Sequence, residues 1–427
     1  MTCGARFHHI MKKFRYEIYD PDVYRDGIPY QTYARLREEM PVSWHEEPPL
    51  PTSPAGPGFW AVMLHEDVQY VSRMTTLYSA SLGTTMLRDP KPEDLPYFRS
   101  MLLNMDPPVH NHYRRIISRT FSKSRLTKFD SFVETRVCEL MAPLRGRSEC
   151  DIVTEVTDEL ALSTLAFLLG VPRGDRRFFF DWANRIIGNH DAEYSDVSDP
   201  ASALADLRSP SELTDLFDYA ESLAEFRRRN PGDDLITELV QSRVDGRGLT
   251  TAEFQNFFFL LAIAGNDTTR SALPGALLAL MDHPEQFDML RDHSELVGSA
   301  IEECLRFAPP VIHFRRTATQ DTVLHDVSIR TGQKVVVFYP SANRDPRAFA
   351  RPDVFDIRRK ERSHVTFGYG PHVCVAAGLA RIQMRHFLTA ATRQMSQPRL
   401  SGQVDRLRSN YMTGFKHVPL TYTPVVP

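Results

Sequence analysis

The chemical feature that stands out in the chain is one cysteine, Cys374, at the end of a glycine-rich stretch. That stretch reads His364-Val-Thr-Phe367-Gly368-Tyr-Gly370-Pro-His372-Val-Cys374. Its glycines permit a tight turn and let the backbone lie close against a flat ligand. The residues that follow, as far as Arg381, have the composition of a helix, and a helix N-terminus favours thiolate over thiol. A lone cysteine is usually a small buried apolar residue, but this context favours a functional thiolate.

A second group of polar residues interrupts the longest apolar helix that the sequence predicts. The group reads Ala264-Gly265-Asn266-Asp267-Thr268-Thr269. Glycine in a helix interior costs about 1 kcal/mol relative to alanine. The residues alone leave two interpretations open, a kink with incidental polar side chains or a groove in which they act on a ligand.

Two further pairs have helical spacing. Glu303 and Arg306 are three residues apart, so they share a helix face and can form an ion pair. Alone this pair is a weak signal, because many such pairs are solvated surface decoration. His110 and Arg114 are four apart and can face one anion. The alternative for this second pair is the first turn of an ordinary surface helix.

Helical patterning dominates the elements that must position these residues. Apolar residues recur at spacings of three and four in the ranges 32–39, 65–74, 107–121, 131–141, 153–169, 210–229, 233–243, 251–282 and 295–307. Extended segments are expected at 59–64, 314–319, 334–338 and 420–426. Residues 340–362 predict a long irregular meander that leads into the cysteine stretch.

Composition narrows the class of protein. The 427 residues are 42% hydrophobic and 25% charged, with a formal net charge of −3. This balance argues against a nucleic-acid or membrane-surface binder. Five scattered cysteines without a Cys-x-x-Cys pair favour a reducing compartment. No apolar run reaches transmembrane length, so we expect no membrane association and a cytoplasmic protein.

No linker, repeat or low-complexity tract marks an internal boundary. We therefore expect a short N-terminal extension over residues 1–18 and one domain over residues 19–427. We also expect this unit to be a monomer.

The cysteine stretch resembles the cysteine loop of the cytochrome P-450 family, soluble bacterial members in particular. The family pattern is Phe-Gly-x-Gly-x-His-x-Cys-x-Gly followed by Leu-Ala-Arg, and only Ala376 departs from it, replacing the second glycine. The resemblance extends from about Tyr19 to Thr421. It implies a mainly α fold with small β-sheets, in which haem lies between the long central helix and the helix of the cysteine loop.

The resemblance also implies a role for each motif. Cys374 would bind the haem iron, with Phe367 and Gly368 beside the haem, while Asp267 and Thr268 would handle dioxygen and protons. Ala264 and Gly265 would leave room over the iron. The haem propionates would be bound by His110, Arg114, Arg316, His364 and His372, with Arg315 an adjacent competitor for the role of Arg316.

In the family, the Glu303–Arg306 pair fixes the meander beneath the haem. Many relatives place an arginine where this chain has Val354, so the third partner of the pair is open. The substrate pocket would be formed by residues 79–104, the segment 178–215, the long helix and the C-terminal turn. Its expected apolar lining is Leu87, Phe258, Leu261, Ala262, Val311 and Ile312, with Met412 and Thr413.

The activity implied is that of a monooxygenase with haem b, which inserts one atom of dioxygen into a C–H bond of an apolar small molecule. A steroid, terpenoid, branched lipid or secondary-metabolite intermediate would suit such a pocket. A separate ferredoxin and ferredoxin reductase would supply electrons, docking near Arg115, Arg119, Lys123 and Arg385. Two alternatives stay open: atypical haem chemistry, such as coupling or peroxide-driven oxidation, and a haem sensor.

Overall fold

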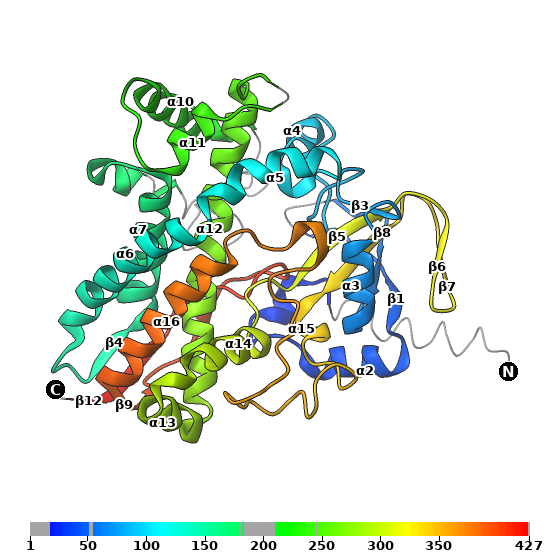
Figure 1. Ribbon diagram of the computed structural model, residues 1–427. Helices are drawn as coiled ribbons and strands as arrows, with labels where there is room; N and C mark the ends of the chain where they lie inside the picture. The colour runs from blue at the N-terminus through cyan, green and yellow to red at the C-terminus, as the bar shows by residue number, and fades with distance from the viewer. Residues whose placement is uncertain (1–17, 51–53, 179–180, 183–209, 245, 426–427) are drawn as a thin grey trace, which may run out of the picture.

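The longest helix, α12 (Thr251–Met281), runs through the middle of the molecule (Figure 1). The structure is a computed structural model that describes residues 18–50, 54–178, 181–182, 210–244 and 246–425. The predicted N-terminal extension and much of the segment 178–215 therefore lie outside the described residues.

A capping box fixes where α12 begins. The Thr250 side chain accepts a hydrogen bond from the Glu253 amide, and the Glu253 carboxylate accepts one from the Thr250 amide. Glu253 also pairs with Arg247 at 2.7 Å and accepts a hydrogen bond from the Tyr113 hydroxyl. Because Tyr113 belongs to α5 (Val109–Thr120), this contact holds the predicted anion-binding helix against the start of α12.

Helices cover α12 on several sides. Contacts join it to α7 (Asp158–Leu169), α10 (Thr214–Arg229), α14 (Val297–Phe307) and α16 (Ala377–Gln394). Besides these and α5, the α-helices of the described residues are α2 (Tyr30–Glu39), α3 (His65–Arg73), α4 (Leu95–Arg99), α6 (Lys123–Met141), α11 (Leu235–Gln241), α13 (Pro284–Asp292) and α15 (Tyr339–Ala342). One apolar cluster packs the first half of α12 against α5, α7, α10 and α11, and a second packs its other half against α6, α13, α14 and α16.

In the described parts of the chain, the strands form four small sheets. The largest has the order β1-β2-β8-β5-β3, namely Val42–His45, Phe59–Val62, Lys334–Phe338, His313–Ala318 and Tyr78–Ser79. Only the β2–β8 pairing in it is parallel. In the second sheet, β12 (Pro419–Pro424) lies between β4 (Glu149–Asp151) and β9 (Met395–Leu400). The last two sheets pair β6 (Thr322–Leu324) with β7 (Val327–Ile329), and β10 (Asp405–Arg406) with β11 (Phe415–His417).

The predicted fold class, mainly α with small sheets, is confirmed. The five-stranded sheet lies with α2, α3 and α15 on one side of the molecule, and α6, α7, α10 and α11 lie on the other (Figure 1). The cysteine loop runs from the end of the meander into α16, which packs beside α12. This packing brings the two principal motifs of the sequence onto neighbouring elements.

Candidate active site

Cys374 lies just before the first turn of α16, as the sequence predicts. Its amide donates a hydrogen bond to the Phe367 carbonyl at 2.8 Å, which closes the loop. Burial raises the pKa of the Cys374 thiol, while a hydrogen bond from the Ala376 amide and the charges of Arg114 and Arg381 oppose that rise. The cysteine nevertheless keeps accessible surface. A thiol that is surrounded by protein and yet keeps accessible surface faces an internal space.

The replacement of glycine by Ala376 is accommodated without strain. Its φ is −92°, a value open to any residue, and its amide still bonds the Cys374 sulfur. Gly368 and Gly370 differ, with φ of 75° and 71° in the left-handed region. A Cβ on Gly370 would also come within 2.9 Å of the Ser72 carbonyl.

On α12, Ala264 is exposed although its neighbours Leu261 and Ala262 are buried. An exposed residue in the middle of a packed helix indicates an internal hollow, and Val373, beside Cys374, is 41% exposed as well. The Thr268 hydroxyl donates to the Ala264 carbonyl at 2.9 Å. A Cβ on Gly265 would meet Leu165 of α7 at 3.1 Å, so this glycine also permits close packing of the two helices.

Four basic side chains, those of His110, Arg114, Arg316 and His372, gather at the cysteine loop. The rings of His110 and His372 are 4.3 Å apart. Burial, with the nearby charges of Arg316 and His110, lowers the pKa of His372 to about 2. Burial also lowers the pKa of Arg114 and of Arg316, which is only 2% exposed.

Neither Arg114 nor Arg316 has a carboxylate partner among the residues that the structure describes. The Nε of Arg316 and the Nε2 of His372 are buried without a hydrogen-bond partner there. A buried cation without a counter-ion is costly, so the cluster is built for an anion. Beside an accessible thiol, it fits a haem whose propionates meet the basic cluster and whose iron meets Cys374.

The side chains of Arg315 and Arg316 lie on opposite faces of strand β5, because successive side chains of a strand alternate between its two faces. Arg315 pairs with Asp89 and donates to Thr317 at 3.3 Å. It is therefore already neutralised, which leaves Arg316 in the basic cluster.

His364 does not join the basic cluster. Its Nε2 lies 3.2 Å from Glu302, and its Nδ1 accepts a hydrogen bond from the Thr366 amide at 3.3 Å. Burial alone would raise the pKa of Glu302, but hydrogen bonds from Arg381 and His364 lower it to about 2. Both ring nitrogens of His364 therefore have partners within the protein, and its propionate contact stays a prediction.

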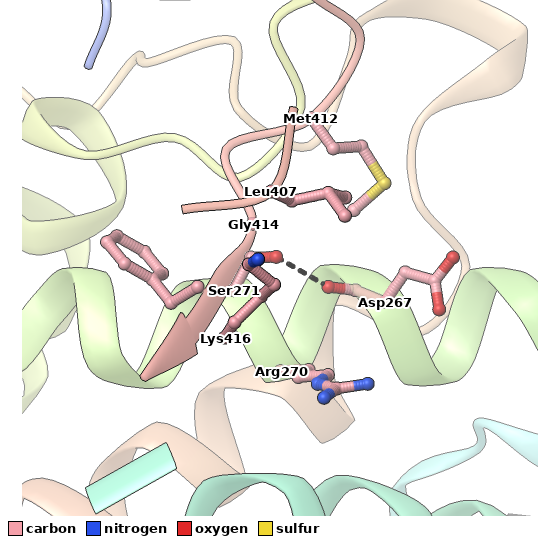
Figure 2. A pocket seen from close by; sticks show the side chains of 8 residues that line it. Asp267, Arg270, Ser271, Leu407, Met412, Gly414 and Lys416 are labelled. Carbon is pink, nitrogen blue, oxygen red and sulfur yellow. Dashed lines mark hydrogen bonds between the residues drawn. The ribbon is translucent and has the colours of Figure 1, made fainter. Parts of the chain in front are cut away.

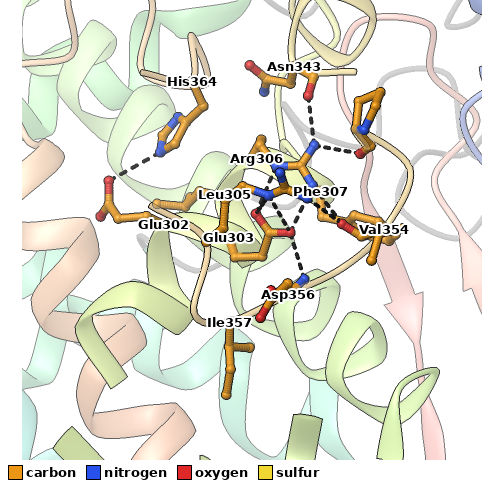
Figure 3. Close-up of polar contacts among 12 residues, drawn as sticks. Glu302, Glu303, Leu305, Arg306, Phe307, Asn343, Val354, Asp356, Ile357 and His364 are labelled. Carbon is orange, nitrogen blue, oxygen red and sulfur yellow. Dashed lines mark hydrogen bonds and ion pairs between the residues drawn. The ribbon is translucent and has the colours of Figure 1, made fainter. Parts of the chain in front are cut away.

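The Glu303–Arg306 pair is buried, with each side chain 1% exposed and Nε 2.8 Å from the carboxylate (Figure 3). Arg306 also donates to the carbonyls of Asn343 and Pro352 at 2.9 and 2.7 Å. These bonds fix the meander against α14.

Arg359 is the third partner that the sequence left open at Val354. Its Nε donates to both carboxylate oxygens of Glu303, at 3.1 and 3.2 Å, and its guanidinium also bonds the carbonyls of Ala350 and Val354 at 2.7 Å. Val354 thus contributes its backbone instead of a charged side chain. The signal in the sequence was the basic run that begins at Arg358, which pattern alone could not separate from a solvated face.

The residues predicted to line the pocket differ in burial. Phe258, Ala262 and Ile312 have no accessible surface and pack in the apolar core. The other predicted lining residues keep some accessible surface. They are Leu87 at 3%, Leu261 at 7%, Val311 at 8%, Met412 at 9%, and Thr413, whose hydroxyl donates to the Pro309 carbonyl at 3.0 Å.

A cleft lies between α12 and the turn that joins β10 to β11 (Figure 2). Asp267 and Ser271 line its α12 side, and the Ser271 hydroxyl donates to the Asp267 carbonyl at 2.8 Å. Met412, Leu407 and Lys416 line the opposite side. Asp267 therefore reaches this cleft, while its neighbour Thr268 bonds back toward Ala264.

In the parts of the chain that the structure describes, no helix is both long and apolar enough to span a bilayer.

Comparison with known proteins supplies the family. A family model described as Cytochrome P450 matches residues 56–396. A steroid C26-monooxygenase of Rhodococcus jostii is 36% identical over 95% of this chain and 84% of its own length. A methyl-branched lipid omega-hydroxylase of Mycobacterium tuberculosis is 36% identical over 95% of this chain and 92% of its own. A Mycobacterium marinum cytochrome P450 solved with pseudoionone has a TM-score of 0.83 and 35% identity, covering 92% and 94% of the two chains.

Proposed function

This chain belongs to the cytochrome P450 family and is a P450 monooxygenase, and on that premise we propose that it hydroxylates the end of a branched apolar chain. Its substrate would be a steroid with a full side chain or a methyl-branched lipid, and its electrons would come from a ferredoxin and a ferredoxin reductase. Two relatives with 36% identity support the substrate class, because one is named for position C26 of a steroid and the other for the omega position of a methyl-branched lipid.

The haem, which we propose to be haem b, supplies the iron at which dioxygen is bound and activated. Cys374 would hold that iron from the α16 side. Arg114 and Arg316, with His110 and His372, would bind the propionates. The buried guanidinium of Arg316, which has no carboxylate partner among the described residues, carries the proposal. Phe367 and Gly368 would lie along the face of the ring.

Asp267 and Thr268 are proposed to move protons toward the oxygen side of the site. The Thr268 hydroxyl donates to Ala264 at 2.9 Å, so its oxygen remains free to accept a further hydrogen bond. Asp267 is 8% exposed and lines the cleft beside α12, where it can exchange protons with water. The pair would hold and move protons between the cleft and the space beside Ala264.

Electron delivery is proposed on the surface of α5 and α6. Arg115, Arg119 and Lys123 are exposed, and none has a carboxylate partner among the described residues. Arg385 differs, because it is paired with Asp130. The three free cations would attract an acidic ferredoxin, and the rate of association would fall as salt increases.

A matched panel of ligands tests the substrate proposal. Cholestenone is compared with testosterone, which lacks the side chain, and pristanic acid with linear palmitic acid. We expect the branched members to shift the haem from low to high spin and to be hydroxylated at the chain terminus, as located by mass spectrometry. Equal shifts within each pair, or hydroxylation on the steroid rings, would contradict the proposal.

A further inference from the structure

A carboxylate on α14 holds Arg381 in place beside the cysteine loop. Arg381 lies in the second turn of α16 and follows Cys374 closely in the chain. Its Nε and Nη2 lie 2.6 and 2.8 Å from the two carboxylate oxygens of Glu302, and this two-point contact fixes the plane of the guanidinium. The position of the charge is therefore set by the protein, although the Arg381 side chain is 40% exposed.

Glu302 is itself held by His364. Nδ1 of His364 accepts a hydrogen bond from the Thr366 amide at 3.3 Å, which leaves the proton on Nε2, and Nε2 lies 3.2 Å from Glu302 (Figure 3). The side chains of His364 and Glu302 are 3% and 15% exposed. A largely buried carboxylate, fixed by a histidine, therefore supports the guanidinium.

A further contact places Arg381 against the cysteine loop. The central carbon of its guanidinium lies 4.6 Å from the centre of the Phe367 ring, a cation–π contact. The Phe367 carbonyl accepts the hydrogen bond from the Cys374 amide at 2.8 Å. The positive end of the ion pair therefore contacts the residue that closes the loop onto Cys374, whereas its negative end contacts His364 at the start of that stretch.

The charge of Arg381 acts on the Cys374 sulfur. Burial raises the pKa of the Cys374 thiol, while the Ala376 amide and the charges of Arg114 and Arg381 oppose the rise. Arg114 is proposed to bind a propionate, whose negative charge would offset its own. Arg381 is bound to a carboxylate on another helix and stacked on the loop, so its charge has a fixed place beside the thiolate.

We propose that Arg381, positioned by Glu302, raises the reduction potential of the haem by placing a positive charge beside the Cys374 thiolate. A positive charge stabilises the reduced site, which carries one more electron, and so favours electron transfer from the ferredoxin, which is oxidised in the same step. This inference rests on the proposed ligation of the iron by Cys374. It assigns a use to an ion pair that the proposed function does not explain.

A purely structural ion pair would behave differently. Its two charges would cancel at the haem, so removing both together would leave the reduction potential unchanged. If the positive end faces the thiolate, removing both charges lowers the potential.

The test is an anaerobic redox titration of the holoenzyme in the wild type, in Arg381→Met and in the double variant Glu302→Gln/Arg381→Met. Arg385→Met is the matched control, because Arg385 lies one turn later on α16, is 41% exposed and pairs with Asp130. We expect Arg381→Met to lower the ratio of reduced to oxidised haem at a fixed potential about tenfold, which is about 59 mV for one electron. The double variant should remain about threefold below the wild type on the same scale, and Arg385→Met should match the wild type.

Two results of this titration would overturn the proposal. A double variant with the wild-type potential would show that the two charges only cancel one another. Equal shifts in Arg381→Met and Arg385→Met would show that the place of the charge beside the cysteine loop has no effect.

The infrared C–O stretching frequency of the reduced CO complex gives a second readout. A thiolate without a nearby cation donates more electron density to the iron, and the iron passes part of it to CO, which weakens the C–O bond. We expect Arg381→Met to lower this frequency and Arg385→Met to leave it unchanged. The same frequency in Arg381→Met and the wild type would contradict the inference.

If Arg381→Met does not bind haem, Arg381→Gln takes its place, because glutamine removes the charge while its amide can still donate to Glu302. The same lowering of the potential is expected. Failure of the proposed function is distinguishable, because the wild type would then lack the thiolate-type band of the reduced CO complex. A wild type that has this band, with an unchanged potential in the Arg381 variant, would overturn the present inference alone.

Discussion

Replacing Arg359 with methionine should destabilise the meander. The side chain is 7% exposed, and its guanidinium bonds Glu303 as well as the carbonyls of Ala350, Arg351 and Val354. Removing one partner of a buried ion pair costs about 3–5 kcal/mol. Here Arg306 still neutralises Glu303, so the free energy of unfolding should fall by about 2–4 kcal/mol.

The assay is a urea titration that follows the thiolate-type band of the reduced CO complex together with helical circular dichroism. Arg358→Met is the matched control, because its side chain is 59% exposed and its pair with Asp356 spans 3.3 Å. An exposed pair of this kind contributes at most about 1 kcal/mol. If Arg359→Met and Arg358→Met lost stability equally, the reasoning that makes Arg359 the third partner of the buried pair would be refuted.

Three further outcomes are expected. Thr268→Ala should release more peroxide per electron pair, and unchanged coupling would exclude its role in proton transfer. Arg316→Gln should speed haem transfer to apomyoglobin by about 10–100-fold, as for loss of a cofactor's supporting partner, whereas Arg315→Gln should leave that rate near the wild-type value. Burial raises the pKa of Asp158 from 3.8 to about 7, so the folded protein binds this proton more tightly than the unfolded chain does. The free energy of unfolding of the wild type, relative to that of Asp158→Asn, should therefore fall as pH rises from 4 to 7. At about 1.4 kcal/mol per pH unit, this fall is at most about 4 kcal/mol. Urea denaturation of both proteins at several pH values measures it, and a difference in unfolding free energy that does not change with pH would contradict the raised pKa.

Elements with a strong local pattern were predicted close to their observed bounds. Strand β8 matches the predicted range 334–338, and α12 ends one residue before its predicted end at 282. Helix α6 begins eight residues before the predicted start at 131, because its first turns carry mostly polar residues. The two-residue strand β3 is defined by its pairing with the distant strand β5, which no local pattern reveals. Strand β10 pairs with the nearby β11, but two residues are too few to show an alternating pattern.

In the candidate site, too, residues in a strong local motif were predicted, whereas residues that depend on distant contacts were not. Spacing and motif singled out Cys374, and the fold brings together the basic residues of α5, β5 and the cysteine loop. The choice between Arg315 and Arg316 required the face of strand β5, which depends on how the sheet packs. The buried ion pair between Asp158 and Arg270 had no sequence signal, because the two residues lie more than 100 positions apart in the chain.

The apolar residues predicted to line the pocket also differ in burial, which the sequence did not reveal. Phe258 and Leu261 lie one turn apart on α12 and are equally apolar, but only Leu261 keeps accessible surface. Helical periodicity identifies an apolar face without saying whether that face meets a cavity or another helix. The neighbouring elements settle that question.

The central claim, that Cys374 holds the iron of a haem monooxygenase, is tested most directly by the reduced CO difference spectrum of the wild type and of Cys374→Ser. Cys150→Ser is the control, because Cys150 is buried in a different part of the fold. The expected result is a thiolate-type CO band in the wild type and in Cys150→Ser, and its loss in Cys374→Ser. A thiolate band that survives in Cys374→Ser would contradict the assignment of the iron ligand and the site built around it.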